Sequence, residues 1–415
     1  MSADQPEPLE QPMDGGKALW PAHASEKRPW SSTGRLGSRE DRMFRQVEVS
    51  LPPMIAELSW QPPQTIAGEI AHATREITAL DTDPRPYLGA LGALLVRTES
   101  VASSKIEHID ASMDDYARAQ AGVKSNSSAS AMVAATQAFR LVLASVDDQG
   151  SIELDALLAA HRILMADDAF ERAHAGKLRE VQNWIGGSDY SPRGAVHIPP
   201  PSESVPSYMN DLLRFCSRTD LNPFVQAAIA HAQFESIHPF TDGNGRIGRI
   251  LINALFRSRG LTTTVVIPVA SALLAQQQRY FDAVNDYRNG NVLGFTELLV
   301  RGAGIAATAA RESADVFAQL TGEWSERVRL RAGSAAASLL PLLVSNPVVT
   351  VADVERLVGA VPSSAGAAIA RLEAAEILRP VTNRTRNQVW VAADVVAELD
   401  ELNSRIAKLA SQAAQ

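Results

Sequence analysis

The chain has 415 residues, of which 46% are hydrophobic and 21% charged, values that fit a globular protein and exclude a wholly disordered or fibrous one. Its 39 Lys and Arg against 47 Asp and Glu give a formal charge of −8, which argues against a general role in coating nucleic acid. The single cysteine, Cys216, excludes an intrachain disulfide. The sequence has no run of about 18 apolar residues, so it does not predict a membrane span. The first residues also lack a secretory pattern, so we expect a cytoplasmic protein of two or three domains.

Residues 1–45 combine many Pro, Gly, Ser and charged residues with few apolar ones. Such a segment buries too little surface to offset its ordering entropy, so we predict a disordered tail. Composition and periodicity divide the remaining chain into four parts. These are an N-terminal helical region at 46–150, a helical core at 151–330, a small domain at 331–400 and a C-terminal tail at 401–415.

Apolar residues recur at helical spacing through the first two of these parts, which predicts a mainly α fold. The predicted helices cover residues 87–109, 130–146, 154–165 and 246–257. Asn222 followed by Pro223 is typical of a further helix N-terminus, and Gly260 is a stop signal after the last of these helices.

One stretch of the core is not helical. Residues 183–201 are dense in Gly and Pro, which mark turns and end helices. Within this stretch, residues 195–198 can pair as a short strand, and the prolines that follow prevent its continuation. We therefore predict a small β-hairpin here.

The most informative segment runs His238-Pro-Phe-Thr-Asp-Gly-Asn-Gly-Arg-Ile-Gly-Arg249, between two predicted helices. The N-terminus of the second helix offers unpaired N–H groups and a partial positive charge, which favour phosphate. Gly243 and Gly245 let the backbone approach an anion closely. Asn244 adds a side-chain amide donor.

Four further side chains of this segment suit phosphate chemistry. Arg246 and Arg249 lie three residues apart on similar faces of the helix and match a polyphosphate. Asp242 is a hard oxygen ligand suited to Mg²⁺, and His238 can accept a proton from a hydroxyl near neutral pH. The alternative is a purely structural turn, since Asp, Gly and Asn are ordinary turn residues, but it leaves the histidine and both arginines unexplained.

The segment after residue 330 has a different pattern. It predicts helices over 334–343, over 351–358 with Thr350 as N-cap and over 363–378, followed by a hairpin over 378–391. This order is the layout of a winged helix-turn-helix, a fold that often binds DNA. The third helix is rich in alanine and offers few side chains that read bases, so a homodimerisation or other protein-interaction module is the alternative.

The residues from His238 to Arg249 match the pattern HPFx[D/E]GNGRxxR at every position and resemble the Fic (filamentation induced by cAMP) family. Residues 177–187 and 196–201 are also similar to the flap region of that family. The resemblance implies a helical core with a β-hairpin flap. It also implies transfer of AMP from ATP to a Ser, Thr or Tyr hydroxyl of a protein, including the chain itself, with release of pyrophosphate.

The same resemblance assigns roles within the site. His238 would deprotonate the target hydroxyl, Asp242 would hold Mg²⁺ and Arg249 would reach the γ-phosphate. The α- and β-phosphates would be held by Gly243, Asn244, Gly245 and Arg246. An extended target segment would pair with the flap residues Ala195, Val196, His197 and Ile198. Tyr280 and Phe281 would flank the adenine, the alternative being that both are core aromatics.

An inhibitory element is implied near the end of the helix predicted over 87–109. Residues 99–107 resemble the family's inhibitory helix [S/T]xxxE[G/N], with Ser103 and Glu107 four residues apart on one face. In that family the glutamate pairs with the second arginine of the motif, here Arg249, and displaces the γ-phosphate. His108 stands where Gly or Asn is usual, which leaves the geometry of the helix end open.

We therefore expect an autoinhibited protein adenylyltransferase that uses ATP and Mg²⁺ and has no membrane partner. Removal of AMP from a modified protein, with Glu107 aligning a water, is a variant within the same fold. The alternative from another class is a DNA-binding regulator whose core senses nucleotide without turnover.

Overall fold

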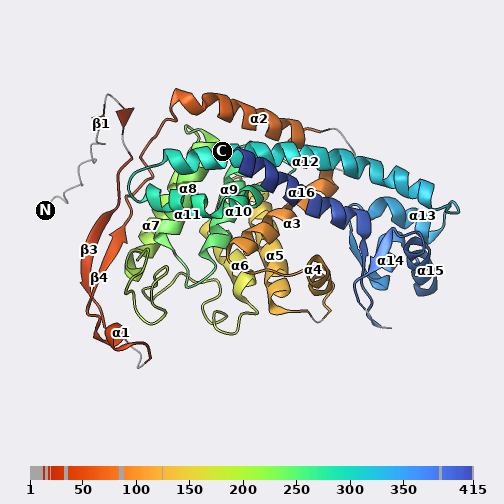
Figure 1. Ribbon diagram of the computed structural model, residues 1–415, viewed down its shortest axis with the longest axis horizontal. Coiled ribbons are helices and arrows are strands. Elements are labelled where there is room, and N and C mark those ends of the chain that lie inside the picture. The colour runs from red at the N-terminus through yellow and green to blue at the C-terminus, as the bar shows by residue number, and fades with distance from the viewer. Residues whose placement is uncertain are drawn as a thin grey trace.

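Helices form most of the molecule, as the mainly α prediction requires (Figure 1). The computed structural model describes residues 13–14, 17–18, 20–31, 36–83, 88–123, 125–382 and 386–413. The helices of these residues are α1 (Arg39–Met43), α2 (Ala67–Asp81), α3 (Leu88–Ile106), α4 (Met113–Gln120), α5 (Ser127–Gln149), α6 (Leu154–Met165), α7 (Val205–Cys216), α8 (Pro223–Ile237), α9 (Asn244–Ser258), α10 (Val269–Ala275), α11 (Gln277–Tyr287), α12 (Leu293–Arg327), α13 (Ala335–Leu339), α14 (Val351–Val358), α15 (Pro362–Glu373) and α16 (Ala393–Gln412). The strands are β1 (Met13–Asp14), β2 (Lys17–Ala18), β3 (Ala24–Pro29), β4 (Gln46–Leu51), β5 (Val348–Val349), β6 (Leu378–Pro380) and β7 (Trp390–Ala392).

Helices α8 and α9 pack against each other at the centre of the helical core. Every residue of α8 from Phe224 to Ile237 is buried, because neighbouring helices cover this helix on all sides. Asn222 caps α8 as the sequence predicts: its Oδ1 accepts hydrogen bonds from the N–H groups of Phe224 and Val225 at 3.0 and 3.4 Å. This central pair positions the loop that joins the two helices.

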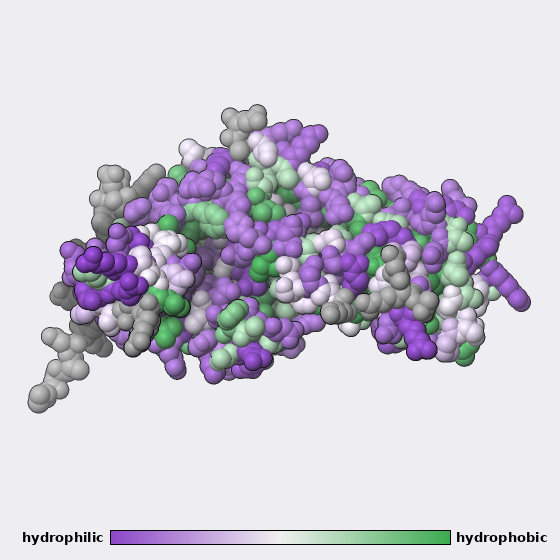
Figure 2. Space-filling model, turned by 60° about the horizontal axis from the view of Figure 1, so that its bottom comes forward, coloured by the Kyte–Doolittle hydropathy of each residue, from purple (hydrophilic) through white to green (hydrophobic). Residues whose placement is uncertain are grey.

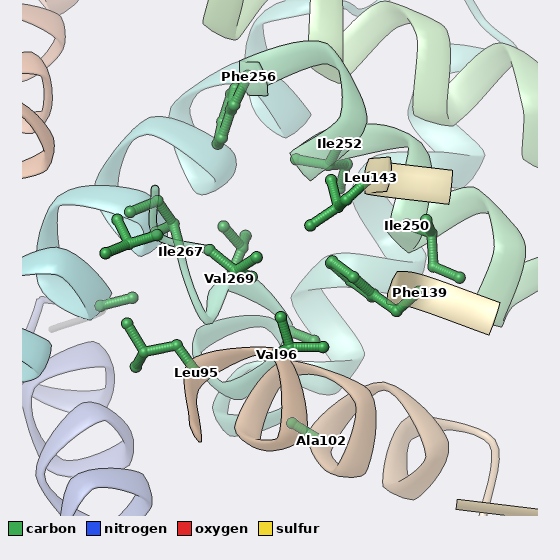
Figure 3. Close-up of a cluster of buried hydrophobic side chains, with 14 of the residues drawn as sticks. Leu95, Val96, Ala102, Phe139, Leu143, Ile250, Ile252, Phe256, Ile267 and Val269 are labelled. Atoms are coloured by element: carbon green, nitrogen blue, oxygen red, sulfur yellow. The ribbon is translucent and has the colours of Figure 1, made fainter. Parts of the chain in front are cut away.

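Helix α3 is held against this centre by buried apolar side chains. Leu95 and Val96 of α3 belong to one buried cluster with Phe139 of α5, Ile250 of α9 and Val269 of α10, which Figure 3 shows from one side. All five are 7% exposed or less, and burying a side chain of this size contributes about 1.5–3 kcal/mol. The packing therefore fixes the end of α3 relative to the start of α9.

The N-terminal segment differs from the disordered tail predicted over 1–45, of which residues 1–12 lie outside the described residues. Strands β3 and β4 form an antiparallel pair with Ala24 opposite Leu51. Trp20 is buried at 4% exposure and its ring lies 6.2 Å from that of Tyr287. The polar composition does not predict this order, because the segment gains backbone partners from β4 and aromatic contacts from distant residues: Trp20 with Tyr287 of α11, and Trp30 with Trp184 at 5.6 Å.

The predicted C-terminal tail at 401–415 also requires correction. Helix α16 continues to Gln412, packs on α10 and α12, and buries Leu402, Ile406 and Ala410. These three residues are four positions apart and so share one helix face. In Figure 1, α16 and the 35-residue helix α12 run from the helical core towards the C-terminal module, which we define as residues 331–392.

The C-terminal module combines α13, α14 and α15 with an antiparallel sheet of order β5-β7-β6. Thr350 caps α14 as the sequence predicts. The arms of the predicted hairpin are β6 and β7, and residues 383–385 between them lie outside the described residues. Arg379 of β6 donates to both carboxylate oxygens of Asp114 in α4 at 3.0 and 2.7 Å. The winged-helix assignment, DNA binding and homodimerisation stay predictions.

Helix α5 is long and apolar enough to cross a membrane by length and composition alone, which differs from the sequence-based expectation of no such segment. Half of the apolar 18-residue stretch of this helix is buried inside the fold, where α5 packs against α3, α6 and α9. The face shown in Figure 2 is mostly hydrophilic, with its hydrophobic residues in separate patches. The absence of a membrane partner stays a prediction.

Candidate active site

His238 ends α8 and begins the loop that the sequence singles out. Its φ is 48°, in the left-handed region that few non-glycine residues adopt. Its carbonyl accepts Arg179 Nε at 2.8 Å, and the same guanidinium donates to the Ile237 carbonyl at 3.4 Å. A cation therefore stabilises the C-terminal end of α8, and His238 lies in the wall of a cavity of about 610 Å³.

The imidazole of His238 is neutral at pH 7. Burial, aided by the cations Arg179 and Arg288, lowers its pKa to about 3. Its Nδ1 has no hydrogen-bond partner within the described part of the chain. An uncharged imidazole in the wall of a cavity is able to take a proton from a hydroxyl.

Asn244 shapes the loop. Its Nδ2 donates to the Phe240 carbonyl at 2.9 Å, and its Oδ1 accepts the Phe240 N–H at 2.8 Å. The residue is only 2% exposed. The side chain therefore holds the turn with one N–H of its amide, and donation of the other to an anion stays a prediction.

His161 of α6 supports the other side of the loop, and the sequence analysis missed it. Its ring stacks on Phe240 with the centroids 3.9 Å apart. Its Nδ1 accepts the Gly176 N–H at 2.9 Å, so Nε2 carries the proton and donates to the Asp242 carbonyl at 3.1 Å. Burial lowers its pKa to about 4, which keeps this arrangement at neutral pH. No spacing signal could reveal it, because these partners are 15 and 81 residues away in the chain.

The start of α9 forms a cradle for an anion. Gly243 is the N-cap with φ 76°, and its N–H donates to Asp242 Oδ1 at 2.6 Å. The next three N–H groups, on Asn244, Gly245 and Arg246, have no acceptor within the helix. The Arg246 side chain is 6% exposed, its Nη2 lies 3.6 Å from Asp242 Oδ2, and its Nε has no hydrogen-bond partner among the described residues.

A carboxylate of the chain itself stands at this cradle. Glu107, the residue after α3, accepts a hydrogen bond from Arg249 Nη2 at 2.7 Å. A Cβ added to Gly245 would collide with Glu107 Oε1, so the carboxylate packs directly on this glycine. Ser103 accepts Arg249 Nε on its Oγ at 2.8 Å and Nη2 on its carbonyl at 2.9 Å. His108 has φ 59°, a conformation typical of Gly and Asn and accessible to His, so the helix end adopts this turn despite the histidine.

Arg249 and Glu107 control each other's charge. Arg249 is fully buried, and burial alone would lower its pKa, but Glu107 beside it raises the pKa above the usual range. Burial would raise the pKa of Glu107, and Arg249 lowers it below its usual value instead. Both groups are therefore ionised at neutral pH, and the structure brings together the three residues that the sequence assigned to inhibition.

The predicted flap forms one wall of the cavity. Ile185 and His197 make an isolated antiparallel bridge, and the Val196 N–H donates to the Ile185 carbonyl at 2.7 Å. Val196 borders the cavity and is 66% exposed. The His197 side chain is buried and its Nε2 bonds to the Ser236 carbonyl at 2.9 Å. Its carbonyl also accepts the Ile185 N–H at 2.8 Å and its N–H donates to the Ile185 carbonyl at 3.4 Å, so His197 anchors the flap and lacks the free backbone groups that its predicted docking role needs.

The N-terminal segment braces this flap, which the sequence analysis did not foresee. The Ser50 N–H of β4 donates to the Ile198 carbonyl at 2.8 Å, so that carbonyl is not free to pair with a target strand. Asp41 of α1 accepts a hydrogen bond from Ser191 Oγ at 2.7 Å. The N–H groups of Ala195 and Val196 donate to the Pro192 and Ile185 carbonyls at 3.2 and 2.7 Å, so the carbonyls of these two residues, but not their N–H groups, are left for target pairing.

Tyr280 and Phe281 of α11 border the cavity in different ways. Tyr280 is 2% exposed, and its hydroxyl bonds to His231 Nε2 at 3.0 Å and accepts Arg249 Nη1 at 3.3 Å. It is thus a core residue that positions Arg249. Phe281 is 39% exposed and offers a ring face to a ligand, so the contact of these residues with adenine stays a prediction.

Asp242 is the candidate ligand for Mg²⁺. Its side chain is 57% exposed at the edge of the cavity. No group of three or more His, Cys, Asp or Glu residues gathers as a metal site in the described residues. A single carboxylate fits Mg²⁺, which is commonly bound through one or two carboxylates, substrate phosphates and water.

Comparisons with known proteins agree with this geometry. Residues 151–256 match the model of the Fic/DOC family. A protein adenylyltransferase Fic from Nematostella vectensis is 29% identical over 157 residues, which cover 36% of this chain and 32% of the relative. A probable protein adenylyltransferase from Aquifex aeolicus is 30% identical over 128 residues, covering 31% of this chain and 37% of the relative. The chain therefore spans about a third of the length of these curated relatives.

Two solved structures are also similar. A Fic family protein from Desulfovibrio desulfuricans G20 aligns with a TM-score of 0.49 and 22% identity, over 80% of this chain and 98% of that chain. Fic-1 from C. elegans aligns with a TM-score of 0.48 and 20% identity, over 61% and 74%. Residues 151–256, which contain α6 to α8, most of α9 and the loop beginning at His238, are a Fic domain.

Proposed function

We propose that this chain is a protein adenylyltransferase that Glu107 holds in an inhibited state. The observation that carries the proposal is the junction of α8 and α9, where a neutral imidazole and an open helix N-terminus border one cavity. The adenylyltransferase relatives support the type of reaction.

In the proposed reaction the hydroxyl oxygen of a Ser, Thr or Tyr side chain attacks the α-phosphorus of ATP. His238 takes the hydroxyl proton, the bond from the α-phosphorus to the bridging oxygen breaks, and pyrophosphate leaves. A positioned base contributes about 10²–10⁴-fold to such a rate. The N–H groups of Asn244 and Gly245 and the Arg246 guanidinium would stabilise the phosphate charge, and one such donor is worth about 10²–10³-fold.

We assign Mg²⁺ to Asp242. The carboxylate uses Oδ1 to accept the Gly243 N–H, and its exposed side chain faces the cavity where the phosphates would lie. When bound, the ion would neutralise phosphate charge. The position of Asp242 is fixed through its backbone, because His161 donates a hydrogen bond to the Asp242 carbonyl.

Glu107 acts as a brake because its carboxylate and a phosphate compete for one guanidinium. With Glu107 Oε1 2.7 Å from Arg249 Nη2, a phosphate oxygen has no access to the same N–H group. The Glu107 side chain is 35% exposed, so it is able to turn into solvent without unfolding α3. Removal of AMP from a modified protein, with Glu107 aligning a water, would use the same cavity.

The test is transfer of label from ATP labelled at the α-phosphate, in the presence of MgCl₂, using the full chain. We expect Glu107→Gly to label protein about tenfold more than wild type, the ratio that about 1.4 kcal/mol of lost inhibition produces. His238→Ala should give no label. Asp110→Ala is the matched control, since this exposed carboxylate follows the same helix and pairs only with Lys105, at 3.2 Å.

Absence of label from Glu107→Gly with ATP and with every other nucleoside triphosphate would contradict the proposed activity. Label that persists in His238→Ala would remove the base from the mechanism. An increase in Asp110→Ala equal to that in Glu107→Gly would show that the inhibition is not specific to the Arg249 partner. Incubating labelled protein with an excess of unlabelled ATP and following the loss of label measures the removal reaction separately.

A further inference from the structure

A second cavity lies between the helical core and the C-terminal module. It has a volume of about 420 Å³ and is bordered by α3, α4 and α5 on one side and by residues 345–348 and α14 on the other. These elements meet where the module adjoins the core in Figure 1. The cavity shares no lining residue with the active-site cavity among those that the structure describes.

Arg97 of α3 places a buried positive charge in the wall of this cavity. The residue is 4% exposed, and its guanidinium lies 4.5 Å from the centre of the Tyr116 ring. Its Nη2 contacts Met113 Sδ at 3.6 Å, whereas Nε and Nη1 have no hydrogen-bond partner in the described ranges. Asp400 attracts it but forms no hydrogen bond with it.

Such a group is unusual in a protein interior. A guanidinium stays protonated at physiological pH, and a buried charge is normally paired and hydrogen-bonded because its desolvation is costly. The stacked Tyr116 ring supplies a weak attraction but no acceptor, since its hydroxyl bonds to Thr136 Oγ1 at 3.1 Å. Two N–H directions of Arg97 therefore lack an acceptor from the protein.

The rest of the wall also favours an anion. Arg140 of α5 and Arg356 of α14 are exposed residues at the cavity. Asp353 is the one carboxylate among the described lining residues, and it is already held by Arg356 at 2.9 Å and by the Thr350 N–H at 3.0 Å. Because Arg356 already neutralises Asp353, the guanidinium groups of Arg97 and Arg140 leave the described part of the wall with an excess of positive charge.

We propose that this cavity binds a small molecule that carries a phosphate group, attracted by the under-partnered charge of Arg97 in its wall and by the exposed guanidinium of Arg140. Arginine is well suited to phosphate because it offers several charged donors in one plane. The volume lies in the range of about 300–1,000 Å³ that is typical of small-molecule sites, so the occupant is larger than a lone ion. Gln137 and Asn346 provide polar groups for the remainder of that molecule.

The position of the site ties two parts of the protein together. Arg97 belongs to the same helix as Ser103, which holds Arg249. The opposite wall, with Arg356, belongs to the C-terminal module. A bound phosphate would therefore join the helix that precedes Glu107 to that module.

The test is equilibrium dialysis of the full chain against radiolabelled pyrophosphate at constant ionic strength. An Arg246→Ala background weakens the competing cradle at α9. We expect one saturable site, weakened at least tenfold by Arg97→Met and severalfold by Arg140→Ala. Arg214→Ala is the matched control, because this arginine is exposed and pairs with Glu57 at 2.6 Å away from this cavity, and it should leave the affinity unchanged. Inorganic phosphate and glucose 6-phosphate, used as competitors, distinguish a free anion from a phosphate ester.

Absence of saturable binding in the Arg246→Ala background would overturn the proposal, as would an unchanged affinity in Arg97→Met. Arg140 is exposed, so Arg140→Ala is expected to fold even if Arg97→Met does not. An unchanged affinity in Arg140→Ala, with Arg97→Met unfolded, would equally overturn it. The measurement reports binding alone, so its result does not depend on whether the chain transfers AMP.

Discussion

Replacing Glu107 with glutamine should release the brake partway. Glutamine keeps the size of the side chain and an oxygen that can accept the hydrogen bond from Arg249 Nη2, which is now 2.7 Å from Glu107 Oε1. It removes the negative charge. The contacts of Arg249 with Ser103 and Tyr280 remain, so the change isolates the electrostatic part of the inhibition.

The magnitude follows from the exposure of the two partners. In Glu107→Gln the hydrogen bond from the charged Arg249 remains and only the ion pair is lost, and a pair with an exposed partner contributes up to about 1 kcal/mol. Arg249 is buried, but the Glu107 side chain is 35% exposed, so water screens part of the attraction. We therefore expect a loss of about 1 kcal/mol, which corresponds to about a fivefold rise in AMP transfer, less than the rise expected for Glu107→Gly.

The same substitution should change the response of stability to ATP. Without ATP, Glu107→Gln leaves the buried Arg249 guanidinium without its counter-charge, so the free energy of unfolding falls by about 1 kcal/mol. With ATP, the γ-phosphate replaces that charge. A ligand at 100 times its Kd stabilises a protein by about 2.7 kcal/mol, and wild type should gain less because Glu107 competes.

Thermal unfolding with and without ATP, alongside protein labelling, measures both effects. The transfer rates should increase in the order wild type, Glu107→Gln, Glu107→Gly, and the ATP-dependent rise in Tm should follow the same order. Asp110→Asn is the control for loss of a nearby charge. If Glu107→Gln matches wild type in both rate and ATP response, the charge competition at Arg249 is refuted.

Three further predictions concern the loop after α8. His238→Ala should reduce transfer by at least about 10²-fold while the ATP affinity measured by dialysis stays nearly unchanged; a large loss of affinity would mean that the ring binds nucleotide. Asn244→Ala leaves the buried N–H and carbonyl of Phe240 without partners, so urea unfolding should show a loss of about 1–3 kcal/mol for each group, and a neutral result would contradict the role given to this amide. The pKa of His161 falls from 6.5 to about 4 on folding, so the unfolded chain takes up this proton first. Its contribution to stability is complete above pH 6.5 and is lost as the pH falls towards about 4, with a slope of up to about 1.4 kcal/mol per pH unit. His161→Gln should therefore show a shallower pH dependence than wild type, and equal slopes would be inconsistent with the buried neutral ring.

Local features of this protein were predictable from short stretches of sequence. The helix predicted over 154–165 coincides with α6, and that predicted over 246–257 lies within α9. Asn222 and Thr350 cap the helices expected of them. Gly260 follows the end of α9 with φ 65°. These signals depend on residues a few positions apart, so the chain does not need its tertiary fold to express them.

The anion cradle at α9 belongs to the same category, because its glycines, arginine and free N–H groups are neighbours in sequence. The Asn244 amide is the exception. Its Nδ2 and Oδ1 pair with the Phe240 backbone, a structural role that the motif alone did not indicate, while its donation to an anion stays a prediction.

The remaining features arise only when distant segments meet. Glu107 and Arg249 are 142 residues apart. The family resemblance suggested that they pair, but the packing of α3 on α9 sets the distance between the two side chains. His161 reaches the loop from 81 residues away, and Arg97 faces a wall contributed by a module more than 200 residues later. The same principle applies near both ends of the chain. Strand β3 has a polar sequence but pairs with β4, and α16 is held by its packing against α10 and α12. Burial and charge pairing depend on which surfaces come together in space, and that is decided by the whole fold rather than by any single stretch of residues.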